Sequence, residues 1–142
     1  MSKLNTLLLA GLLACAGGYA QAAGEANARL TRDQASAEHD RVEATYKADK
    51  EACKKMDGNA KDVCEAEAKG KEQVANAEID YKRSGTERDR MKIAETRAKA
   101  DYAIAKERCE DRPRAEQSLC KKEAKAAEKA AIANAKKAHP VS

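Results

Sequence analysis

The sequence predicts an all-α protein built from two disulfide-pinned antiparallel helical hairpins, arranged as a four-helix bundle or as an extended coiled-coil-like array of long helices. Three observations lead to this fold class. Charged residues make up 37% of the chain, and together with abundant alanine they give it a strong intrinsic preference for helix. Strong helix breakers gather at three sites, which divide the chain into four helical stretches. Four of the five cysteines form two pairs of equal spacing.

One sequence unit occurs twice. An offset of 56 residues places the pair Cys53 and Cys64 on the pair Cys109 and Cys120. The same offset aligns a set of tyrosine, lysine, glutamate and alanine positions: Tyr46 with Tyr102, Lys50 with Lys106, Glu51 with Glu107, Glu67 with Glu123, Ala68 with Ala124, Lys69 with Lys125 and Glu72 with Glu128. Because a fixed period of this kind marks a structural repeat, we expect two similar hairpins.

The first hairpin is expected within residues 23–83. Residues 26–56 predict one helix, since they contain no proline or glycine. Asp57-Gly58-Asn59 is a turn tripeptide that ends it, and a second helix follows over residues 60–82. Five positions follow the spacing of a coiled-coil seam and predict the packed side of the first helix: Val42, Tyr46, Asp49, Cys53 and Met56, of which all but Asp49 are largely apolar.

The second hairpin is expected within residues 84–142. Ser84-Gly85-Thr86-Glu87 separates it from the first, and either hydroxyl residue is a candidate cap for a third helix over residues 86–110. Pro113 ends that helix because proline lacks the amide hydrogen. A fourth helix is predicted over residues 114–137, followed by a frayed tail. Its packed side is predicted to carry Leu119, Ala124, Ala127, Ala131 and Ile132.

The N-terminus has the three parts of a secretory signal peptide. Lys3 lies in a short polar start, an apolar stretch covers residues 7–16, and Ala20-Gln21-Ala22 has the small-residue pattern of a cleavage site. We therefore expect residues 1–22 to be a signal peptide cleaved after Ala22, and the mature protein to be periplasmic. The apolar stretch is about half the length that a helix needs to cross a bilayer.

A second interpretation of the N-terminus is a membrane-anchored lipoprotein. Leu12-Leu13-Ala14-Cys15 resembles a bacterial lipobox, in which the cysteine is acylated. The bulky Leu13 stands where small residues are usual, so the soluble product is the favoured interpretation. A membrane contact is expected only if Cys15 is acylated.

The charge pattern argues against specific nucleic-acid binding. The formal net charge is +4, and basic residues alternate with acidic ones along the chain. The chain has no Phe or Trp on which bases would stack, and its basic residues are not clustered. The expected partner is an unknown envelope protein or a second copy of the chain.

The cysteines are expected to form structural disulfides. A turn midway between the members of each pair would fold Cys53 onto Cys64 and Cys109 onto Cys120, so local pairing is the prediction. The alternative is a continuous helix through each pair, which would require each cysteine to bond to one on another helix. Wide pairs of this kind favour disulfides over zinc, and no Cys-x-x-Cys redox motif is present.

The remaining candidates have plain structural interpretations. His39 and Glu43 lie one helical turn apart and would together offer two metal ligands, but a solvated helix surface is the prediction, and no metal or cofactor is expected. His139 is expected in the frayed tail. Tyr46 and Tyr102 are expected to pack beside the disulfides. No catalytic residues are assigned, and we expect the protein not to be an enzyme.

The segment from Gly58 to Cys64, followed by Glu-Ala-Glu-Ala-Lys, resembles a group of exported Ala/Lys/Glu-rich proteins of Gram-negative bacteria, often labelled TolA-like cell-envelope proteins. The resemblance covers the first hairpin, and the second only through its cysteine spacing. It implies a cell-envelope location. Two functions remain open: a non-catalytic periplasmic structural or interaction protein, and a periplasmic stress-response chaperone that binds unfolded clients.

Overall fold

The computed structural model describes residues 29–140, and within them the protein is all-α. The chain forms α1 (Arg32–Cys53), α2 (Gly58–Ser84), α3 (Glu87–Arg108), a short 3-10 helix η1 (Cys109–Asp111) and α4 (Arg114–Ala138). Residues 29–140 contain no strand. The predicted fold class of two disulfide-pinned helical hairpins is therefore confirmed.

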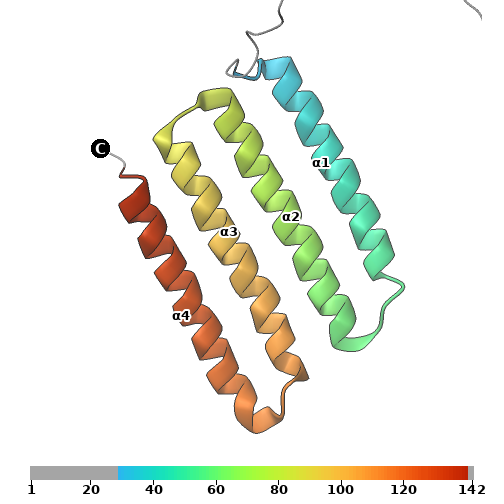
Figure 1. Ribbon diagram of the computed structural model, residues 1–142. Coiled ribbons are helices and arrows are strands. Elements are labelled where there is room, and N and C mark those ends of the chain that lie inside the picture. The colour runs from blue at the N-terminus through green and yellow to red at the C-terminus, as the bar shows by residue number, and fades with distance from the viewer. Residues whose placement is uncertain (1–28, 141–142) are drawn as a thin grey trace, which may run out of the picture.

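The four helices form an open up-down-up-down bundle (Figure 1). Extensive contacts join α1 to α2, α2 to α3 and α3 to α4, and the pairing of α2 with α3 is the most extensive. The helices therefore lie side by side, with α1 and α4 at opposite edges and the two hairpin tips at the same end of the molecule (Figure 1). One side of each outer helix has no helix of residues 29–140 packed extensively against it.

The first helix begins later than its sequence suggests. Thr31 is the N-cap residue: its side chain accepts a hydrogen bond from the amide of Gln34, whose own side chain accepts one from the Thr31 amide. This capping box satisfies two amide groups that a helix start leaves unpaired. The predicted helix start at residue 26 is wrong, because Arg29 and Leu30, the first residues that the structure describes, are not helical.

The hairpin turns follow the predicted breakers closely. Gly58 has a φ of +59°, a left-handed conformation that favours glycine. Asn59 is helical, and its side-chain amide donates to the Glu107 carbonyl on α3 at 2.8 Å. In the second hairpin Pro113 is the N-cap residue of α4. The two tips thus reverse the chain by different local structures.

The connection between α2 and α3 is fixed by a left-handed glycine and a helix cap. Gly85 has a φ of +65° and closes α2. The Thr86 side chain caps α3 by accepting from the amide of Asp89 at 3.1 Å. Ser84 and Thr86 donate to the Asp89 carboxylate, and these hydrogen bonds hold the pKa of that carboxyl below its ordinary value.

The buried core consists mainly of small side chains. The buried apolar residues are Ala35, Cys53, Ala68, Ala77, Ile79, Ala98, Ala100, Cys109 and Ala135. Gly70 on α2 is also buried, and a Cβ there would lie 3.0 Å from the Cβ of Ala100 on α3. Small residues let the helix axes approach closely but remove little apolar area from water, so the disulfides carry a large share of the stabilisation.

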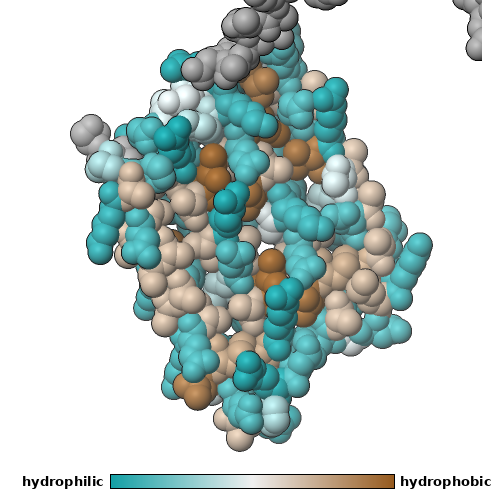
Figure 2. Space-filling model, in the orientation of Figure 1, coloured by the Kyte–Doolittle hydropathy of each residue, from teal (hydrophilic) through white to brown (hydrophobic). Residues whose placement is uncertain are grey.

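The fourth helix packs less deeply than predicted. Ala127 and Ala131 are exposed, and 60% of Leu119 is accessible to solvent. The side of α4 that meets α3 instead buries Ala135 and the side chain of Glu128, including its carboxylate. In Figure 2, which shows one broad face, strongly hydrophobic residues form a few separate patches between rows of hydrophilic side chains.

Candidate functional site

The two disulfides pin both hairpins at the same end of the molecule. Cys53 is bonded to Cys64 with their Cα atoms 5.6 Å apart, and Cys109 to Cys120 with theirs 5.7 Å apart. The local pairing predicted from the spacing is confirmed. Cys53 and Cys109 are almost completely buried, at 0% and 1% exposure. Two intact structural disulfides indicate an oxidising compartment outside the cytoplasm.

In each hairpin a tyrosine of the first helix packs against a lysine of the second. The ammonium group of Lys69 lies 5.1 Å from the ring centre of Tyr46, and that of Lys125 lies 4.5 Å from the ring centre of Tyr102. These distances are typical of a cation–π contact. Both tyrosines are half-buried, and the contacts that the structure gives their rings are with lysines.

Each of these lysines also pairs with a glutamate one turn later on its own helix. Lys69 lies 2.6 Å from Glu72, and Lys125 lies 2.5 Å from Glu128. The hydrogen bond to the carboxylate raises the pKa of both lysines above the ordinary value. The repeat thus preserves a tyrosine–lysine–glutamate cluster in each hairpin.

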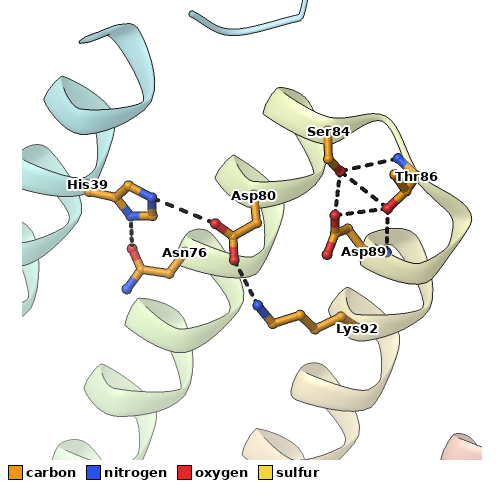
Figure 3. A network of polar contacts seen from close by, with 7 residues as sticks. All are labelled: His39, Asn76, Asp80, Ser84, Thr86, Asp89 and Lys92. Carbon is orange, nitrogen blue, oxygen red and sulfur yellow. Dashed lines mark hydrogen bonds and ion pairs between the residues drawn. The ribbon is translucent and has the colours of Figure 1, made fainter. Parts of the chain in front are cut away.

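A polar network links α1, α2 and α3 near the other end of the molecule (Figure 3). The His39 Nδ1 lies 2.7 Å from the side-chain oxygen of Asn76, and its Nε2 lies 3.9 Å from Asp80. Asp80 also accepts a 2.8 Å hydrogen bond from Lys92 on α3. His39 is half-buried at the α1–α2 junction, and it therefore links two helices.

The possible metal site at His39 and Glu43 is not assembled. Glu43 pairs with Lys47 at 2.7 Å, and this contact lowers the pKa of the Glu43 carboxyl. Across residues 29–140, no three His, Cys, Asp or Glu side chains gather closely enough to hold a metal ion. His139, expected in a frayed tail, instead lies 3.1 Å from Glu87 on α3.

The depressions in the surface are shallow and lined by charged and small residues. One of them, about 630 Å³, lies between α3 and α4 beside the second disulfide. Its lining residues are Asp101, Ile104, Ala105, Arg108, Cys109, Arg112, Cys120, Glu123 and Ala124. A smaller groove of about 170 Å³ between α1 and α2 includes Val42 and Tyr46. Grooves of this character suit contact with another polypeptide better than enclosure of a small molecule.

The ion pairs between α2 and α3 were not foreseen from the sequence. Arg108 lies 2.6 Å from Glu67, and Arg97 lies 3.1 Å from Glu78. A sequence with charges on every helical face does not show which pairs will meet. The only usable signal was the repeat itself, because it identifies corresponding sides of the helices.

Comparisons with protein-family models, with curated proteins and with solved structures found no match to this chain. The expected signal peptide, with its cleavage site after Ala22 and the alternative acylation site Cys15, lies outside the described residues. None of the helices in residues 29–140 combines the length and the apolar character that crossing a membrane requires.

Proposed function

We propose that this protein is a non-catalytic structural or interaction protein of the periplasm, acting within the cell envelope. The observation that carries the proposal is the open arrangement of its helices. Within residues 29–140, extensive packing joins only helices that follow one another in the chain, so one long side of α1 and one of α4 carry no packed helix and offer surface for other molecules. The disulfides hold these sides in a fixed geometry without a large apolar core.

The periplasmic location draws support from two independent features. The N-terminal sequence has the pattern of a secretory signal peptide, and the paired cysteines are suited to an oxidising compartment. The resemblance of the first hairpin to TolA-like envelope proteins agrees with this location.

Crosslinking in cells tests the proposal. A photoreactive amino acid would replace one exposed alanine on each helix: Ala44, Ala60, Ala103 and Ala126. We expect adducts with an envelope component at one or more of these positions. The matched control is Ala98, which is 5% exposed and should give no adduct. Recovery of the protein in the cytoplasmic fraction, or no adduct at any exposed position, would contradict the proposal.

A stress-response chaperone is the second candidate function. Two large apolar residues, Met56 and Leu119, are exposed at 44% and 60%, and both lie near the hairpin tips. Apolar side chains at one end of a molecule offer contacts for an unfolded client. Suppression of client aggregation by the purified protein, lost in a Leu119→Ser variant, would favour the chaperone. Unchanged aggregation would favour the interaction protein.

A further inference from the structure

The outer side of α4 corresponds to a side of α2 that is already buried in a helix–helix contact. The offset of 56 residues places α1 on α3 and α2 on α4. Several contacts between side chains recur at the same offset. Both disulfides and both tyrosine–lysine contacts are related by this offset. The ion pair of His39 with Asp80 recurs as Glu95 with Lys136, with the acidic and basic partners exchanged.

Each hairpin is therefore a copy of the other in the same orientation. The side of α2 that packs on α3 has its counterpart on the outer side of α4. The side of α3 that packs on α2 has its counterpart on the outer side of α1. We call the outer side of α4 the α4 edge and the outer side of α1 the α1 edge. The α2–α3 contact thus shows how the α4 edge of one molecule would fit against the α1 edge of another.

The helices α2 and α3 approach each other closely at Gly70. A methyl group at this position would place its carbon 3.0 Å from the Ala100 Cβ and 3.8 Å from the end of the Ile104 side chain. The counterpart of Gly70 on α4 is Ala126, which is exposed. The counterparts of Ala100 and Ile104 on α1 are the exposed Ala44 and Ala48.

The side chains at these edges differ from those of the α2–α3 contact at two positions. Ala126 carries the methyl group that Gly70 lacks, and in the α2–α3 geometry that methyl carbon would lie 3.0 Å from the Cβ of Ala44, so the two edges fit at a slightly wider spacing than α2 and α3. Ala48 is smaller than its counterpart Ile104. Another buried residue of α2, Ala77, has the exposed Ala133 as its counterpart on α4. The two edges therefore retain the small residues that allow close helix packing.

The two outer helices also carry opposite net charge. The outer helix α4 has seven basic and three acidic residues, whereas α1 has four basic and six acidic residues. The groove between α2 and α3 is lined in part by Gln73, Thr96 and Lys99. The repeat replaces these with one basic residue on α4 and two acidic residues on α1, namely Lys129, Asp40 and Glu43. An α4 edge facing an α1 edge would bring these opposite charges together.

We propose that the partner of this protein is a second copy of itself, with α4 of one molecule packed on α1 of the next. The inference rests on the proposed function and names its partner. The contact joins two different surfaces, so it is a heterologous contact that leaves one edge free at each end of the assembly. Further copies add at these ends and extend the row of helices. Because charge pairing contributes, the association weakens as salt increases.

Two edge variants and their mixture test this arrangement. Ala44→Arg blocks the α1 edge and Ala126→Arg blocks the α4 edge. Ala103→Arg is the control, because Ala103 is an exposed alanine on the central helix α3. Protein exported from cells that express the full chain would be purified, and its size measured by sedimentation velocity over a range of protein and salt concentrations. Circular dichroism would show that each variant is folded.

The expected result is specific to a head-to-tail contact. The wild type and Ala103→Arg form dimers and larger species, and each edge variant alone stays monomeric. An equimolar mixture of Ala44→Arg and Ala126→Arg forms a dimer and nothing larger, since one intact edge of each kind remains. A wild type that is monomeric at every concentration overturns the inference, as does a folded edge variant that assembles like the wild type.

The two proposals fail in distinguishable ways. If the purified protein is monomeric but crosslinks in cells to a different envelope protein, the self-association fails and the interaction function stands. If the protein assembles in solution but is recovered in the cytoplasm, the proposed location fails while the contact between copies stands.

Discussion

Opening one disulfide measures how far the covalent links stabilise this protein beyond its small core. The double substitution Cys109→Ala with Cys120→Ala removes the second link without leaving a free thiol. The two cysteines are 11 residues apart in the sequence. Closing a loop of this size lowers the entropy of the unfolded chain and so contributes about 3 kcal/mol to the free energy of unfolding. With an unfolding entropy of about 2 cal/mol/K per residue, the melting temperature should fall by roughly 13 °C.

The first disulfide supplies a matched variant, since Cys53 and Cys64 are also 11 residues apart. Urea denaturation followed by far-ultraviolet circular dichroism should show similar losses for both double variants. The folded variants should remain helical, because the helices keep their own propensity. Unchanged denaturation midpoints would refute the entropic reasoning. Peptide mapping of the non-reduced protein checks the pairing, and a bond between the two hairpins would contradict it.

Three further predictions concern the helix contacts and caps. Gly70→Leu should lower the free energy of unfolding by about 1–3 kcal/mol, because the larger side chain overpacks the α2–α3 contact. The control Ala103→Leu, on the exposed side of α3, should leave the midpoint of urea denaturation unchanged. Equal effects of the two substitutions would contradict the close approach of α2 and α3. Gly58→Ala and Gly85→Ala should each cost about 1–2 kcal/mol, since both glycines have a left-handed backbone, and a neutral result in the same assay would argue against that conformation. Hydrogen bonds lower the pKa of Asp89 in the folded protein, so the stability they contribute is present above its ordinary pKa and is lost as the pH falls through the lowered value. The variant Asp89→Asn should therefore lose less of its free energy of unfolding than the wild type as the pH is lowered into the acid range. An equal loss in both proteins would count against the cap.

The sequence by itself determined the features that depend on near neighbours in the chain. Helix propensity and the breakers at Gly58, Gly85 and Pro113 specified four helices. The cysteine spacing, with a turn midway in each pair, specified local disulfides. The start of α1 was misplaced because a capping box at Thr31 outweighed the helix propensity of the residues before it.

Only the tertiary structure decided which helix sides meet. Ala127 and Ala131 looked like a packing seam but are exposed, and His39 looked solvated but joins α1 to α2. The reason is physical: alanine and charged residues occupy every side of these helices, so no broad apolar stripe fixes their rotation. That rotation is set by many small contacts summed between distant residues, such as Gly70 against Ala100, and by the direction in which each disulfide holds its hairpin.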